Sequence, residues 1–432
     1  MRNLLIFVLF SQPLSVFADH GFFAITGVTI HSQQEGAPPL EDGVIVVMNG
    51  KISCLGVENL GVQKVPPKSA HPLHHKVCTI PQGIETFAFQ GKIVIPGQFE
   101  SLGRLGQIEV DAEESTHDGV AAHLSNLAHV RAIDGIQMGS RALDAARKGG
   151  IAATLVRPLG GALIAGQSTA FRLQGTVIDD ALLKSPVAIH VNLGDEAKID
   201  QPLVGARSGQ LALLRTLLER AKRLADFDQG KKIKDSAGLD SLQKLRDDPA
   251  MLALAVVFAK KQPLPIVVHA HRADDIAAAL RLQHEIGFSL IIAGGAEAHL
   301  LADRLALASV PVILGPIRVP PYSWATRNAS LGAAAILAYA GVTVAIASAE
   351  THNARNLRWE AGFSVQNGLP WAVALAAITS TPAQILNLPG LGQIAEGQSA
   401  DFSVFDGDPL SLQGHLLFVS LAGVIDAQPK QR

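Results

Sequence analysis

The stretch PIVVHAHRADDIAAALRLQHEIGFSLIIAGG, from Pro265 to Gly295, contains the pattern that decides the fold. A valine-rich apolar run (PIVVHAH) is followed by an amphipathic segment (DDIAAALRLQHEIG) and then by a second apolar run (SLIIAGG). Short β-branched runs are typical of buried strands, and apolar residues with a period near 3.6 are typical of a helix. The stretch therefore predicts a strand, a helix and a second strand, joined as in a βαβ unit.

The same alternation extends along the chain in both directions. Further apolar runs are separated by segments with helical periodicity, among them SGQLALLRTLLERAKRLADF (208–227); these runs are IAATLV (151–156), VAIHVNL (187–193), VPVILG (310–315) and VTVAIAS (342–348). About eight such units fit between Ile93 and Leu388, which favours a (β/α)₈ barrel of the TIM type. No GxGxxG motif follows the first strand, so a doubly wound dinucleotide-binding sheet is less well supported.

Both ends of the chain are β-rich and differ from this middle part. FFAITGVTIH reads as a strand, and GVIVVMNGKISCLG reads as two strands joined at Asn49-Gly50, a strong hairpin signal. Near the other end, DFSVF and LLFVSLAGVIDA are also strand-like. We therefore expect one small β-sandwich domain from residues 19–95 plus 393–432, with the barrel, residues 96–392, inserted into it.

Composition and charge limit the classes of partner. Hydrophobic residues make up 48% of the 432 residues and charged residues 17%, so a sizeable core can be buried. The formal net charge is −2, and the basic residues form no stripe of the kind that nucleic-acid binders carry. Aromatic residues make up only 5%, which argues against a surface for stacking sugars or bases. We expect a small-molecule substrate or ligand and no nucleic-acid partner.

The first 18 residues have the features of an export signal. Arg2 is followed by the apolar run LLIFVLF (Leu4–Phe10) and by Val16-Phe17-Ala18, which fits a cleavage site. The run is far shorter than the roughly 20 residues that span a bilayer. We expect a cleaved signal peptide (1–18), a periplasmic or secreted protein and no membrane insertion after cleavage. A buried N-terminal strand is the alternative.

The sequence contains two cysteines, Cys54 and Cys78. In an oxidising compartment a disulfide between them is plausible, because the segment that joins them is loop-like and rich in proline. Two buried free thiols are the alternative.

Several motifs, in the right order along the chain, resemble the imidazolonepropionase-like branch of the amidohydrolase superfamily. They are GKIVIPGQFES (91–101), VRAIDGIQ (130–137), ATLVRPLGGALIAGQSTAFRLQG (153–175), VVHAHRADDI (267–276), ARNLRWEAGFSVQNGLP (354–370) and ALAAITSTPAQILNLPGLGQIAEGQSADFSVFDGDPL (374–410). The resemblance covers nearly the whole chain after the signal. It implies a (β/α)₈ barrel that carries one or two divalent metals, commonly zinc, at its C-terminal mouth.

The metal-ligand positions that this resemblance implies are only partly kept. Leu102 and Arg104 stand where the family has two histidines on its first strand, and Gly294 stands at the histidine position of the sixth strand. Glu100 shares a face of the first strand with these two residues and is a candidate ligand. A guanidinium stays protonated and has no acceptor atom, so Arg104 cannot ligate a cation. The resemblance therefore predicts a degenerate metal site.

Three histidines remain as candidate metal ligands: His269 and His271 on the fifth strand, and His190 on the fourth. On the eighth strand, Ala349 or Glu350 falls where the family has an aspartate that moves a proton. A catalytic zinc generally needs three protein ligands and an open position for water. One divalent metal, zinc first among the choices, and a metal-free mouth with hydrogen-bonded histidines both stay open.

Two functions follow from these residues and the resemblance. The first is a hydrolase of a linear or cyclic amide or another non-peptide C–N bond, in which Glu350 moves a proton and Arg104 clamps the substrate or polarises its carbonyl oxygen. The second is a catalytically inactive relative that serves as a periplasmic ligand-binding or scaffolding protein. A homo-oligomer is the default, since many relatives are oligomers. The βα loops contain no motif that identifies a substrate.

Overall fold

The computed structural model describes residues 21–58, 73, 76–110, 112–120, 124–197, 204–230, 242–319 and 321–427. The expected signal peptide (1–18) lies outside these residues, so it and the periplasmic or secreted location stay predictions. Among the described helices, none combines the length and apolar character needed to cross a bilayer.

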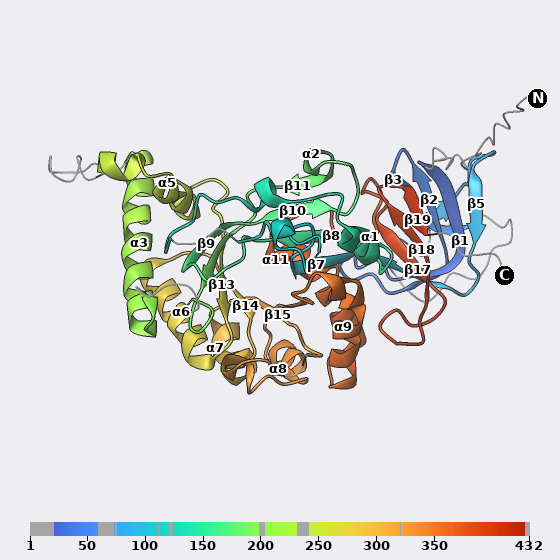
Figure 1. Ribbon diagram of the computed structural model, residues 1–432. Coiled ribbons are helices and arrows are strands. Elements are labelled where there is room, and N and C mark those ends of the chain that lie inside the picture. Colours follow the sequence, from blue (N-terminus) through green and yellow to red (C-terminus); the bar gives the residue numbers. More distant parts are fainter. Residues whose placement is uncertain are drawn as a thin grey trace, which may run out of the picture.

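Strands from both ends of the chain share one nine-stranded sheet, seen at the right of Figure 1. Its order is β19-β18-β17-β6-β1-β2-β3-β4, with β5 beside β1. The strands are β1 (Phe22–Ile30), β2 (Leu40–Met48), β3 (Lys51–Glu58), β4 (Val77–Cys78), β5 (Glu85–Ala88), β6 (Ile93–Pro96), β17 (Phe402–Phe405), β18 (Leu416–Leu421) and β19 (Val424–Ala427). Phe23, Phe402 and Phe418 pack ring against ring in its core. The sandwich arrangement and the domain boundaries stay predictions.

The hairpin predicted at Asn49-Gly50 is confirmed. Strands β2 and β3 pair antiparallel up to Met48 and Lys51, and Asn49 and Gly50 both have positive φ, 52° and 72°. A Cβ on Gly50 would lie 2.4 Å from the Ala422 carbonyl oxygen, so the turn needs glycine for its contact as well as for its backbone.

The remaining strands form two sheets that continue into one another. Their orders are β11-β10-β8-β7 and β16-β15-β14-β13-β12-β9. Only Ser168 separates β9 from β10, and its backbone N–H donates to the Ala188 carbonyl at 3.0 Å. The bounds are β7 (Gln98–Gly103), β8 (Ile151–Val156), β9 (Ile164–Gln167), β10 (Thr169–Arg172), β11 (Leu182–Lys184), β12 (Ile189–Asn192), β13 (Ile266–Ala270), β14 (Leu290–Gly294), β15 (Val312–Leu314) and β16 (Val344–Ile346).

The direction of these strands departs from a regular βα alternation at one place. The pairs β7–β8 and β12 through β16 are parallel, but β10 is antiparallel to β8 and β9 is antiparallel to β12. The prediction of an uninterrupted series of βα units is therefore wrong between β8 and β12. That segment is rich in glycine and lacks a long stretch with helical periodicity, so it forms strands β9 to β11 and only one short helix, α2 (Ile178–Ala181).

Alternating side chains divide the core into an inner and an outer part. On β13, Val267 packs with Phe99, Ile291 and Ile313 inside the curve of the strands, whereas Val268 joins the outer cluster beneath the helices. Figure 1 shows helices α3, α6, α7, α8 and α9 along the outside of these strands. The α/β class is confirmed, and closure into an eight-stranded barrel stays a prediction.

The outer helices follow the expected periodicity. In α3, buried residues recur every three or four positions at Gln210, Leu214, Leu218 and Ala221. The α-helices are α1 (Arg141–Arg147), α3 (Arg207–Asp228), α5 (Pro249–Ala255), α6 (Ala273–Ile286), α7 (Ala302–Leu307), α8 (Ala333–Tyr339), α9 (Leu357–Gln366), α10 (Trp371–Ala377) and α11 (Ser380–Ile385). Short 3₁₀ helices are η2 (Glu114–Thr116), η3 (Ala132–Gly135), η5 (Val256–Phe258), η6 (Ala298–Leu301), η7 (Trp324–Thr326) and η8 (His352–Asn356).

Candidate active site

A cavity of about 320 Å³ lies at the carboxyl ends of the parallel strands. Its walls come from the end of β7, from the residues that follow β8, β12, β15 and β16, and from the ends of β13 and β14. They are Leu102, Arg104, Arg157, Glu196, His269, His271, Gly294, Gly315, Pro316, Val319, Tyr322, Ala349 and Glu350. The carboxyl ends of parallel strands are where barrels of this kind place their binding sites.

Two arginines face this cavity. Arg104 follows β7 and Arg157 follows β8, and within the described residues neither guanidinium forms an ion pair with a carboxylate. The Arg157 guanidinium donates to the carbonyl of Pro158 at 3.3 Å. Burial, and then the positive charge of Arg104, lower the pKa of Arg157 to about 10. Arg157 therefore still carries its proton at neutral pH.

The three predicted histidines lie close together, but only two of them reach the cavity. His190 is fully buried behind the wall, and its Nδ1 lies 2.9 Å from Nε2 of His269. Burial, followed by the charge of Arg157, holds the pKa of both rings well below the ordinary value. His271 has its Nε2 at 3.5 Å from the Tyr322 hydroxyl and at 3.8 Å from a Glu196 oxygen, and burial lowers its pKa as well.

These residues do not fit a metal ion. In the part of the chain that is described, no three side chains of His, Cys, Asp or Glu converge in a way that could hold one. Nε2 of His269 faces His190 instead of an open site, and the positive charges of Arg104 and Arg157 repel a cation. His190 and His269 are hydrogen-bonded to each other, whereas the His271 ring contacts Tyr322. The assignment of His269, His271 and His190 as metal ligands stays a prediction that this arrangement does not support.

Gly294, at the end of β14, lies against the His271 ring and leaves no room for a side chain of its own. Its φ is +82°, and a Cβ would lie 2.7 Å from Cε1 of His271. The His271 ring thus fills the space beside the strand in which the family resemblance implies a histidine. A larger residue at position 294 would collide with the His271 ring.

Glu100 is not a ligand candidate in the structure. Its side chain is fully buried and is absent from the cavity wall. Oε2 accepts hydrogen bonds from the Ser348 backbone N–H at 3.0 Å and from its hydroxyl at 2.5 Å, while Oε1 accepts from the Leu102 N–H at 3.0 Å. Burial raises the pKa of Glu100 to about 7. The carboxyl group links β7 to the segment that follows β16.

The two predicted catalytic residues, Glu350 and Arg104, both lie on the cavity wall. The Arg104 backbone N–H donates to the Glu350 carbonyl at 3.4 Å, so the two segments lie side by side. Ala349 also lines the cavity, so both residues considered for the eighth-strand position reach it. Their catalytic roles stay predictions.

Two wall residues were not singled out from the sequence, Arg157 and Glu196. The available signal was their position, since each is a charged residue close behind an apolar strand run. Tyr322, on the segment that follows β15, also lines the cavity.

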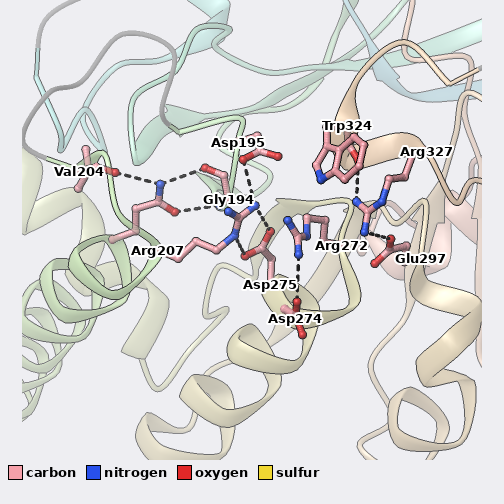
Figure 2. A network of polar contacts seen from close by, with 11 residues as sticks. Gly194, Asp195, Val204, Arg207, Arg272, Asp274, Asp275, Glu297, Trp324 and Arg327 are labelled. Carbon is pink, nitrogen blue, oxygen red and sulfur yellow. Dashed lines mark hydrogen bonds and ion pairs between the residues drawn. The ribbon is translucent and has the colours of Figure 1, made fainter.

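The loop that carries Glu196 is held by a polar network, shown in Figure 2. The Arg207 guanidinium of α3 binds Asp275 of α6 at 2.7 Å and Asp195 at 3.0 Å. Gln210 accepts from the Gly194 N–H at 2.9 Å and donates to the Gly194 carbonyl at 3.0 Å. These bonds fix the residues just before Glu196 and thereby position its carboxylate near His271.

Comparison with known proteins agrees with this fold. The sequence pattern of the Amidohydrolase family matches residues 338–417. Amidohydrolase tasK of Hapsidospora irregularis is 26% identical over an alignment of 450 positions that covers 92% of this chain and 42% of that protein. The chain thus spans less than half the length of this relative.

Two solved structures show the likeness of fold. An amidohydrolase from Thermotoga maritima MSB8 superposes with a TM-score of 0.78 at 23% identity, covering 93% of this chain and 99% of that one. An adenosine deaminase from Xanthomonas campestris with bound zinc superposes with a TM-score of 0.51 at 16% identity, covering 95% and 93%.

Proposed function

We propose that the chain is a member of the amidohydrolase superfamily that hydrolyses a carbon–nitrogen bond of a small molecule bound in the cavity described above; its similarity to amidohydrolases in sequence and fold supports this. The resemblance of the sequence motifs to the imidazolonepropionase-like branch supports a place in that branch. The order of strands from β7 to β16 supports a closed barrel, with the gap between β7 and β16 joined through Glu100.

The observation that carries the proposal is that Arg104, Glu350 and His271, whose pKa burial lowers, line the same cavity. The carboxylate of Glu350 takes a proton from a water molecule, whose oxygen attacks the carbonyl carbon of the substrate. The guanidinium of Arg104 stabilises the negative charge that develops on the carbonyl oxygen. The C–N bond then breaks, and the proton passes to the departing nitrogen.

The superfamily typically uses a divalent metal, but the residues here do not fit one, so no step of this proposal uses it. The positive charge at the reacting carbonyl comes from guanidinium groups instead. We propose accordingly that turnover withstands treatment with a metal chelator. Loss of turnover on chelation, with recovery on adding zinc, would contradict this part of the proposal.

The test is a turnover assay on N-acyl amino acids, lactams and dipeptides with the wild type, Glu350→Gln and a control. Glu219→Gln, on the exposed face of α3, removes the same charge far from the cavity. We expect Glu350→Gln to lose about 100-fold or more in kcat with an unchanged melting temperature, and Glu219→Gln to behave like the wild type. Equal rates for the wild type and Glu350→Gln would overturn the role of Glu350.

A second candidate function is a non-catalytic ligand-binding protein. Among the described residues, the lack of three converging metal ligands favours it. Calorimetric binding of a compound from the panel, with no turnover of any compound by the wild type, would support it over the hydrolase.

We propose further that the protein is exported and forms a homo-oligomer. The first is tested by mass spectrometry of the mature N-terminus, which is expected at Asp19. Light scattering of the purified protein tests the second.

A further inference from the structure

The two arginines of the cavity differ from other partly buried arginines of this protein. Arg207 pairs with Asp275 at 2.7 Å, Arg318 pairs with Glu360 at 2.7 Å, and Arg172 pairs with Asp401 at 3.1 Å. Across the described residues, neither Arg104 nor Arg157 has a carboxylate within ion-pair distance. Their two positive charges face the same cavity, and the carboxylates of that cavity, Glu196 and Glu350, form no ion pair with either of them in the described residues.

This arrangement is unfavourable until an anion enters. The two guanidinium groups repel one another, and the charge of Arg104 contributes to the lowered pKa of Arg157. A planar oxyanion relieves the repulsion and offers acceptors for several of the N–H donors at once, which an ammonium or neutral group cannot do. The backbone holds both arginines at adjacent strand ends, because β7 and β8 are paired.

We propose that Arg157 and one N–H edge of Arg104 together bind one carboxylate group of the ligand, so that the other N–H donors of Arg104 stay available to the reacting carbonyl oxygen. This inference rests on the proposed function, since it names the class of substrate that the same cavity takes. The other charges of the wall set the choice of anion: Glu196 and Glu350 line the cavity too and oppose a second negative charge. A singly charged carboxylate is therefore favoured over a phosphate dianion.

Probes without a hydrolysable bond separate binding from turnover. We would titrate the full-length protein with butyrate, with its neutral isostere 2-pentanone and with inorganic phosphate, following ligand binding by NMR at low ionic strength and pH 7.5. We expect the wild type to bind butyrate at least ten-fold more tightly than 2-pentanone and more tightly than phosphate. Raising the salt concentration should weaken butyrate binding.

Variants assign the effect to the arginine pair. Arg104→Gln and Arg157→Gln should each lose the preference for butyrate, whereas Arg141→Gln should keep it, since Arg141 is 94% exposed on α1. Arg104→Lys serves as a second variant if Arg157→Gln does not fold, and it should weaken binding without abolishing it.

The outcomes distinguish this inference from the proposed function. Equal binding of butyrate and 2-pentanone, or tighter binding of phosphate, overturns the carboxylate site even if the enzyme turns over an amide. Charge-dependent butyrate binding that needs both arginines supports the site even if no compound of the assay panel is hydrolysed.

Discussion

Glu100 is a buried carboxyl group whose proton should make the stability of the protein depend on pH. Burial raises its pKa from 4.5 to about 7. A group whose folded pKa exceeds its unfolded pKa stabilises fully below the unfolded value, and this contribution is lost as the pH rises through the folded value. We therefore expect the contribution of Glu100 to the free energy of unfolding to fall by about 2 to 3 kcal/mol between pH 5 and pH 8.

The measurement is urea unfolding of the wild type and Glu100→Gln from pH 5 to pH 8. The difference in free energy of unfolding between the two proteins should shrink or change sign as the pH rises, because the variant has no proton to lose. The histidines with lowered pKa act in the opposite direction in both proteins, and so cancel in this difference. Glu219→Gln should differ from the wild type by the same amount at every pH.

Gly294 offers a second test at the scale of one residue. Gly294→Ala adds a Cβ that lies 2.7 Å from the His271 ring at a φ of +82°, whereas Gly287→Ala adds one at a φ of +79° with no atom within 4 Å. The control should cost about 1 kcal/mol for its backbone alone, and Gly294→Ala about 1 to 3 kcal/mol more for the contact. Urea unfolding checks both, and equal costs would show that the His271 ring yields without penalty.

How far the site could be predicted depends on what each residue touches. Four residues of the cavity lie at or just after the end of an apolar strand run: Arg104, Glu350, His269 and His271. Their position at the mouth could therefore be predicted from the alternation of side chains along the strands. Whether the histidines can bind a metal could not be predicted in this way, because it depends on ring contacts such as that of His269 with His190. Such contacts come from the packing of separate strands, which no local pattern in the sequence encodes.

At the scale of elements, helices α3 and α6 are joined by two ion pairs, one partly buried and one exposed, whose contributions to stability can be compared. Arg207 of α3 binds Asp275 of α6, whose side chain is 7% exposed, whereas Arg215 of the same helix binds Glu285, which is 44% exposed. Arg207→Met leaves a buried carboxylate without its partner and should cost about 2 to 3 kcal/mol. Arg215→Met should cost less than about 1 kcal/mol.

Thermal or urea unfolding of the two variants measures these costs, and turnover adds a second readout. Arg207 also binds Asp195, so its loss should release the loop that carries Glu196 and lower turnover, whereas Arg215→Met should leave turnover unchanged. Equal losses of stability in the two variants would contradict the difference in burial as the cause.

Element boundaries were predictable where the period is long and the ends are marked. Helix α6 ends at Ile286 and is capped by Gly287, which has a positive φ, and α3 continues a regular apolar stripe to Asp228. The antiparallel strands β9 and β10 were not predictable, because each has only four residues and a single Ser168 separates them. Runs this short fit several kinds of element, and their pairing with β8 and β12 decides between them.

At the scale of the whole molecule, the pairing of strands in the nine-stranded sheet brings the two cysteines together. Cys54 on β3 and Cys78 on β4 form a disulfide across neighbouring parallel strands. The sequence alone could not decide this, because it depends on β4 adding to the edge of a sheet whose other edge is β19. That sheet combines strands from both ends of the chain, so its pairing is set by contacts between residues hundreds of positions apart.

The disulfide gives the last prediction, since it closes a loop of 24 residues. A cross-link over this separation restricts the unfolded chain, and removing it should cost about 3 kcal/mol. Cys54→Ala with Cys78→Ala should therefore unfold at a lower urea concentration than the wild type, and a reducing agent should lower the unfolding midpoint of the wild type only.

The disulfide lies at the edge of the sheet opposite the edge formed by β19, and neither cysteine lines the cavity. Turnover and butyrate binding should therefore be unchanged at urea concentrations below the unfolding transition. Two free thiols found by mass spectrometry of unreduced protein would contradict the disulfide, and loss of butyrate binding in the double variant would show that the sheet and the cavity are coupled.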